Sequence, residues 1–185
     1  MILSFDFGLM SGYAIVNEHC QGDPLLAEYG EKSFKGKKTP AHGIVFLHVN
    51  QWIHATVAQA YRLALEHEDT ELPLQVVVEK PHMRQFAATK LAMVMYGLAE
   101  MHCSRVSGIF SDCHTGTLKK WATGHGKADK ADMIAAARVI FPAGTTDCGE
   151  HAADAMLLAA HRLYEERGAD LRPFACPVTT RIKPV

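Results

Sequence analysis

The hydrophobic positions near the start of the chain are grouped into short runs that predict three successive strands. A first run ends on Asp6, a turn between Gly8 and Gly12 follows, and a second run reaches Val16. Two apolar runs joined by a glycine-bounded turn are typical of a β-hairpin. A third run at residues 24–34 continues the pattern. We therefore expect the chain to open with three antiparallel strands.

Beyond residue 40 the apolar residues recur at spacings of three and four, which predicts amphipathic helices. Two further short runs interrupt these helices and are expected to be strands. The run at residues 74–79 is rich in valine and ends on Glu79, which favours a central strand buried on both faces. The other run covers residues 106–111. The predicted helices cover residues 41–68, 83–103, 115–123, 128–141 and 150–167.

The order of these elements predicts a single α/β domain, in which helices flank a mixed five-stranded sheet whose first three strands are antiparallel. A chain of 185 residues is long enough to bury one core of ordinary size. After residue 167 the periodicity stops and three prolines follow. Residues 168–185 are therefore expected to be an extended or mobile tail.

Composition places the chain among soluble globular proteins. Hydrophobic residues make up 48% of the chain and charged residues 21%, and no apolar run is long enough to cross a bilayer. The N-terminus carries no basic segment ahead of its first apolar run, which argues against a secretory signal. The five cysteines are irregularly spaced, with no C-x-x-C pair, as expected of reduced thiols. We expect a cytoplasmic protein without a membrane partner.

Three acidic residues occupy apolar settings in which an unpaired charge would be costly. Asp6 ends the first strand, Glu79 ends the valine-rich strand, and Asp154 lies in the apolar part of the last predicted helix. Carboxylate oxygens suit Mg²⁺ or Mn²⁺, and such ions can activate water and stabilise a leaving oxygen in phosphodiester cleavage. The simpler alternatives are that Asp6 caps its own turn and that the other two acids are ordinary surface groups.

Basic residues are unevenly distributed although the net charge is only −1. If the fold gathered them on one side, they would form a face that binds phosphates. The alternative for any one cluster is an ordinary solvated surface. The clusters comprise Lys32, Lys35, Lys37 and Lys38; Lys80, Arg84 and Lys90; and Lys119, Lys120, Lys127 and Lys130.

Three motifs together are similar to the active-site signatures of RuvC-type Holliday junction resolvases, within the RNase H-like superfamily. They are F-D-F-G-x-x-S-G-Y-A around Asp6, V-V-V-E-K-P around Glu79, and E-H-A-A-D-A, which contains His151 and Asp154. The resemblance implies an RNase H-like nuclease domain over residues 1–167. It also implies that these four catalytic residues hold two Mg²⁺ or Mn²⁺ ions, and that a homodimer nicks four-way DNA junctions symmetrically.

The resemblance also assigns DNA-contacting residues. The segments L-K-K-W-A-T-G and K-A-D-K-A-D resemble the part of the family that places lysines against the DNA backbone; the nearest matches are Lys119 and Lys130, with Lys120 and Lys127 as neighbours. The family usually carries an aromatic wedge soon after the catalytic glutamate, and this chain departs from that pattern. The expected substitutes for the wedge are Met83 and Phe86, and Arg84 between them is expected to bind DNA as well; the alternative for Phe86 is packing in the core. The short, lysine-rich chain resembles the phage-borne branch, some members of which are thought to cut other branched DNA.

Other functions remain open at this point. Another RNase H-like nuclease, acting on flaps or RNA–DNA hybrids, would use the same acids. An actin-like or sugar-kinase ATPase also begins with an Asp-x-Gly hairpin, but it would need a second such hairpin and a Gly-Gly adenosine loop, and the sequence has neither. A non-catalytic DNA-binding dimer would have no reason to keep three converging acids.

Overall fold

The computed structural model describes residues 1–18, 24–35, 42–66, 73–81, 86–142, 145 and 147–167. These residues form five strands and five helices in the predicted order. The strands are β1 (Ile2–Asp6), β2 (Met10–Glu18), β3 (Pro24–Ser33), β4 (Gln75–Glu79) and β5 (Ile109–Cys113). The helices are α1 (His42–Glu66), α2 (Phe86–Arg105), α3 (Thr115–Thr123), α4 (Lys130–Ile140) and α5 (Glu150–Arg167).

The five strands form one mixed sheet in the order β3-β2-β1-β4-β5. The first three strands are antiparallel, as predicted, whereas β4 and β5 run parallel to β1. The strand expected at the centre, β4, is indeed internal and buried, but the middle position belongs to β1. The carboxyl ends of β1, β4 and β5 therefore lie at one end of the sheet.

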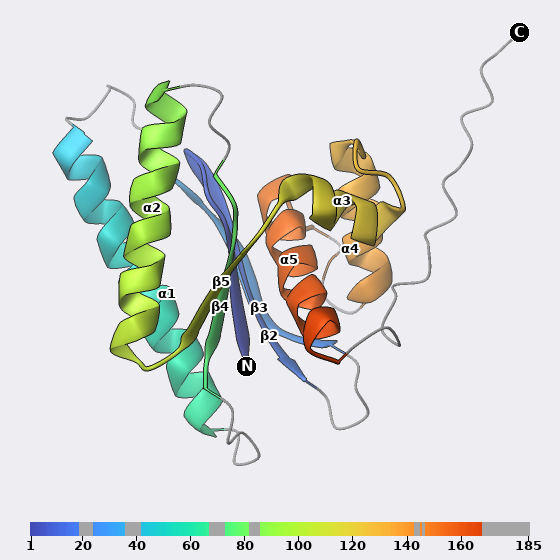
Figure 1. Cartoon of the computed structure of the whole chain (residues 1–185), viewed down its shortest axis with the longest axis horizontal. Helices are drawn as coiled ribbons and strands as arrows, with labels where there is room; N and C mark the ends of the chain where they lie inside the picture. Colours follow the sequence, from blue (N-terminus) through green and yellow to red (C-terminus); the bar gives the residue numbers. More distant parts are fainter. Residues whose placement is uncertain are drawn as a thin grey trace, which may run out of the picture.

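Helices cover both faces of the sheet (Figure 1), with α1 and α2 on one face and α3, α4 and α5 on the other. The two-residue period of a strand divides β1 between these layers. Leu3 and Phe5 pack with α1 and α2, whereas Ile2 packs with α5. Ser4 faces α5 as well, and its buried hydroxyl donates a hydrogen bond to the Ala155 carbonyl oxygen at 2.6 Å. This bond ties the middle strand to the last helix.

Strand β5 begins three residues later than the sequence predicts. Ser107, at φ 54°, is in the left-handed region, and the Gly108 N–H donates to the Cys103 carbonyl at 3.0 Å. Residues 106–108 thus close the end of α2 and do not belong to the strand. The predicted tail at residues 168–185 lies outside the described residues.

Two expectations drawn from composition can be compared with the described part of the chain. Cys103, Cys113 and Cys148 are buried free thiols there. None of the helices described is long and apolar enough to span a bilayer.

Candidate active site

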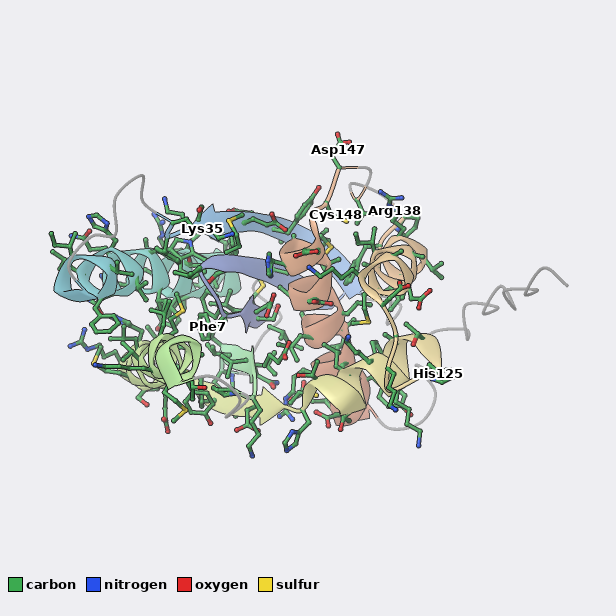
Figure 2. All side chains as sticks on the ribbon, turned by 90° about the horizontal axis from the view of Figure 1, so that it is seen from above. Phe7, Lys35, His125, Arg138, Asp147 and Cys148 are labelled. Carbon is green, nitrogen blue, oxygen red and sulfur yellow. The ribbon has the colours of Figure 1, made fainter. Side chains whose placement is uncertain are left out.

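Asp6 and Glu79 end two neighbouring parallel strands, so both lie at the carboxyl end of the sheet. The strand period places the Asp6 side chain on the face of Ser4, and the Glu79 side chain on that of Val77, which packs with α5. His151 and Asp154 come from the first turns of α5, three residues apart on one side of the helix. Three elements thus supply the four predicted site residues to one end of the molecule, which Figure 2 views from above with Phe7 marking the end of β1.

A glycine allows the start of α5 to approach the sheet. Gly12 pairs with Asp6 across the hairpin, and a Cβ built on it would lie only 1.9 Å from the His151 carbonyl oxygen. Any larger residue at this position would push the first turn of α5 away. The glycine of the hairpin motif therefore has a packing role that places His151 over the end of β1.

Asp6 contacts His151 directly, with 2.6 Å between Oδ2 and Nδ1. The other ring nitrogen, Nε2, lies 3.4 Å from Glu150 Oε1. The hydrogen bond to Asp6 raises the pKa of His151, against the opposing effect of burial. The hairpin turn is closed instead by Ser11, whose Oγ accepts from the Gly8 N–H at 3.1 Å and donates to the Gly8 carbonyl at 2.9 Å. Asp6 is therefore not needed as a turn cap.

The carboxyl groups of Glu79 and Asp154 both have strongly raised pKa values. Burial raises the pKa of both carboxyl groups to about 7, and repulsion from Asp6 adds to the shift. A hydrogen bond donated by the Thr115 hydroxyl and the positive charge of Lys119 lower the pKa of Glu79 only in part. Asp154 Oδ1 is buried and has no hydrogen-bond partner among the described residues. Two carboxylates are thus held together with too little positive charge.

The donor atoms suit a divalent cation, although the side chains as placed do not enclose one. Within the described residues, no three His, Cys, Asp or Glu side chains form a group that could hold a metal ion. The carboxylate of Asp6 is turned to the imidazole of His151. The buried, unpartnered oxygen of Asp154 and its repulsion with Glu79 and Asp6 are features that a hard cation would relieve.

Comparison with known proteins shows the fold. The Thermus thermophilus RuvC structure gives a TM-score of 0.68 over 90% of this chain and 95% of that chain, at 18% sequence identity. T. thermophilus RuvC in complex with Holliday junction substrate gives 0.69 over 90% and 94%, at 16% identity. The chain has a RuvC-type fold.

The yeast mitochondrial Holliday junction resolvase Ydc2 shares the fold more distantly, with a TM-score of 0.61 over 88% of this chain and 77% of that chain, at 9% identity. No protein-family profile and no curated protein sequence matches the chain. The chain therefore shares the RuvC-type architecture with these structures at low sequence identity. The phage-borne branch suggested by the sequence stays a prediction.

The four predicted DNA-contacting lysines occupy different settings on this RuvC-type scaffold. Lys119, on α3, is partly buried; its Nζ donates to the Ala128 carbonyl at 2.8 Å, and its charge acts on both Glu79 and Asp154. Lys130 begins α4 and pairs with Glu150 Oε1 at 2.5 Å. Lys120 and Lys127 are exposed on α3 and in the turn after it. Of these four lysines, Lys119 is the one whose charge acts on the carboxyl groups of Glu79 and Asp154.

The residues predicted to contact DNA after Glu79 lie largely outside the described part of the chain. Met83 and Arg84 lie outside the described residues, and Phe86 begins α2 with a side chain that is not described.

Three contacts at the site had no counterpart in the sequence analysis. Thr115 binds Glu79, Glu150 lies between Lys130 and His151, and Glu31 of β3 accepts hydrogen bonds from the start of α5. Glu150 could have been predicted as a site residue because it directly precedes His151 in the sequence. Glu31 could not, because only the pairing of β3 with β2 brings it beside the start of α5.

Proposed function

We propose that this protein is a divalent-metal-dependent endonuclease that resolves four-way DNA junctions by symmetric nicking. The observation that carries the proposal is the convergence of Asp6, Glu79, His151 and Asp154 at one end of a RuvC-type sheet, with two buried carboxylates short of positive charge. A structural cluster would be expected to pair its charges internally. This cluster is better suited to receive cations.

Each residue of the site has a separate task in this proposal. Mg²⁺ or Mn²⁺, as a pair of ions, would supply an activated water and stabilisation of the leaving oxygen. Asp6 and Glu79 present ligands from rigid strands, and Asp154 presents its unpartnered Oδ1 from α5. His151, whose Nδ1 lies 2.6 Å from Asp6 Oδ2, would be the fourth ligand. Lys119 offsets the negative charge shared by substrate and carboxylates.

DNA binding is assigned to the lysines around α3 and α4. Lys119, Lys120, Lys127 and Lys130 would contact backbone phosphates, which are bound by charge regardless of sequence. The segment that follows Glu79 in the sequence would also contact DNA, through Met83, Arg84 and Phe86. Met83 and Phe86 would fill the opened centre of the junction. Unstacking base pairs there costs a few kcal/mol, which an inserted side chain offsets. The neighbour solved with Holliday junction substrate supports this class of ligand.

A homodimer is part of the proposal. Each chain offers a single cluster of the four residues, and symmetric cutting of a two-fold junction calls for two sites related by the same symmetry. Sedimentation of the protein with and without junction DNA measures this directly.

The decisive experiment is a cleavage assay on labelled four-way junction, duplex, flap and RNA–DNA hybrid, each with Mg²⁺, Mn²⁺ or EDTA. We expect paired nicks in the junction with either metal ion and intact DNA in EDTA. Preferred cutting of hybrid or flap would assign the site to another RNase H-like activity. Binding without cleavage in any metal would leave a non-catalytic DNA-binding protein.

A further inference from the structure

We propose that Glu31 is a positioning residue that fixes His151 over Asp6, a role that in its catalytic consequence rests on the proposed function. Asp6, Gly12 and Glu31 form one row across three strands, because Asp6 pairs with Gly12 and Gly12 pairs with Glu31. The first turn of α5 lies directly over this row. The two acids at its ends reach the same turn from opposite sides of Gly12.

The Glu31 carboxylate binds the backbone of that turn. Its Oε1 accepts from the His151 N–H at 3.0 Å and from the Ala152 N–H at 3.1 Å. Both donors are among the first N–H groups of α5, which have no partner within the helix, and the positive end of the helix dipole favours an anion there. A glutamate on an exposed strand face usually samples many rotamers, whereas two hydrogen bonds hold this one in place.

Two glycines provide the space that this contact requires. A Cβ on Gly149 would lie 2.2 Å from Glu31 Oε1, and a Cβ on Gly12 would lie 1.9 Å from the His151 carbonyl oxygen. The turn is thus clamped between the sheet and the Glu31 carboxylate. A side chain at Gly12 would move the backbone of His151, and a side chain at Gly149 would displace the Glu31 carboxylate.

Other contacts hold the rest of α5, so the influence of Glu31 is local. Ser4 binds Ala155 one turn further along. Ahead of the helix, the Cys148 N–H lies 3.5 Å from the Thr145 carbonyl, and Figure 2 shows Cys148 beside Arg138 of α4. Loss of Glu31 should therefore leave α5 docked but release its first turn, which sets the 2.6 Å contact between His151 and Asp6.

Glu28 offers a matched control on the same strand. Its carboxylate accepts a hydrogen bond from the Tyr13 hydroxyl at 2.6 Å and another from the Gln59 amide of α1, on the opposite face of the sheet. Glu28→Ala and Glu31→Ala therefore remove the same side chain and two hydrogen bonds from β3. Only Glu31→Ala removes them from the first turn of α5.

The test compares the whole protein with its Glu31→Ala, Glu31→Gln and Glu28→Ala variants by three measurements. The imidazole NMR signals of His151 report its contact with Asp6 without metal, calorimetry reports Mn²⁺ binding, and single-turnover cleavage is separated from junction affinity. We expect Glu31→Ala to shift and broaden the His151 signals. It should also weaken Mn²⁺ binding by about 10–100-fold, as loss of a group that orients a ligand does, and slow cleavage at unchanged junction affinity.

Glu31→Gln retains an acceptor oxygen and should restore most of each property, and Glu28→Ala should lower the melting temperature without moving any of the three. Wild-type His151 signals and Mn²⁺ affinity in Glu31→Ala would overturn the inference, as would equal losses in Glu28→Ala. If the wild-type protein binds no Mn²⁺ and cuts no DNA, the proposed function fails. The His151 signals alone then decide whether Glu31 positions the ring.

Discussion

The charged side chains at the two ends of α5 differ in whether they have partners within the protein. At its last turns, Arg162 Nε donates to Gln75 Oε1 at 2.9 Å, and its other nitrogens lie 3.6 Å from Glu165 and 3.4 Å from Glu166. At its first turns, Asp154 has an unpartnered oxygen among the described residues and repels Glu79 and Asp6. One helix thus carries both a satisfied and an unsatisfied polar cluster.

The contrast separates a structural network from a functional one. At the far end of α5, the last turns, the charged groups are paired within the protein and need no ligand to balance them. The near end retains repulsion that destabilises the fold, and such repulsion is expected where a ligand supplies the missing charge.

Removing a carboxylate from the near end should abolish cleavage. Asp6→Asn, Glu79→Gln and Asp154→Asn each delete a proposed metal ligand, and we expect the single-turnover rate to fall by at least roughly 10³-fold. Junction affinity should stay the same or increase, because a negative charge facing DNA is lost. Glu166→Gln, at the far end, should leave the rate unchanged. Near-wild-type cleavage by any of the first three would remove that residue from the site.

Changing His151 should have an intermediate effect that depends on the metal. His151→Ala should lose about 10²-fold in rate and recover part of it at higher Mn²⁺. His151→Asp replaces a neutral ligand with a charged one and should keep substantial Mg²⁺-dependent activity. Its pH–rate profile should lose the acid limb that arises because the imidazole has to be neutral to bind metal. A wild-type rate and pH profile for His151→Ala in low Mg²⁺ would show that the ring takes no part.

Lysine substitutions should weaken DNA binding by smaller amounts. Each of Lys119→Ala, Lys120→Ala, Lys127→Ala and Lys130→Ala should reduce the slope of log affinity against log salt by up to about one unit. The change should be smallest for Lys130, whose ammonium group is already paired with Glu150. Arg105→Ala, at the end of α2 away from the site, serves as the control. An unchanged slope would identify a lysine as ordinary solvated surface.

The smallest effect is on stability, and its sign follows from the raised pKa values. Because the pKa of Asp154 rises to about 7, the folded protein binds more protons than the unfolded chain between about pH 4 and pH 7, so this group's contribution is lost as pH rises. Asp154→Asn should therefore raise the melting temperature of the metal-free protein at pH 7.5. A gain of about 1 kcal/mol corresponds to roughly 2–4 °C in a domain of this size.

Scanning calorimetry at pH 5 and pH 7.5 tests that sign. At pH 5 only part of this contribution has been lost, so the melting temperatures of wild type and variant should differ less than they do at pH 7.5. Mg²⁺ should reduce the difference in melting temperature at pH 7.5. It supplies positive charge that offsets the repulsion at Asp154 in the wild type, whereas the variant has no charge there to offset. A variant less stable than wild type at pH 7.5 without metal would contradict the electrostatic account of this end of the helix.

Local patterns were sufficient to predict most elements of the fold. The boundaries of α3 and α5 were predicted without error because each helix directly follows a clear break in apolar periodicity. The start of β5 was wrong because Val106 reads as a strand residue, whereas Gly108 and the left-handed Ser107 bind back to the end of α2. A short apolar run cannot reveal a hydrogen bond to the preceding helix.

The acids of the site were predictable because each stands out in an apolar setting. Glu31 was not, since it is followed directly by Lys32 and Ser33 in β3 and resembles any solvated strand residue. Its role depends on the register of three strands and on the space left by Gly12 and Gly149. The pairing of Lys130 with Glu150 likewise depends on how α4 docks beside α5.

The hydrogen bond between Ser4 and Ala155 has a consequence for the order of folding. It joins residues 151 positions apart, and the contact of Asp6 with His151 spans 145. Contacts of such long sequence separation form slowly, and a chain emerging from the ribosome cannot make them until its last helix has been synthesised. Asp6 at the end of the first hairpin therefore stays exposed to solvent until α5 has been made. The four site residues come together only when nearly the whole domain is available to fold.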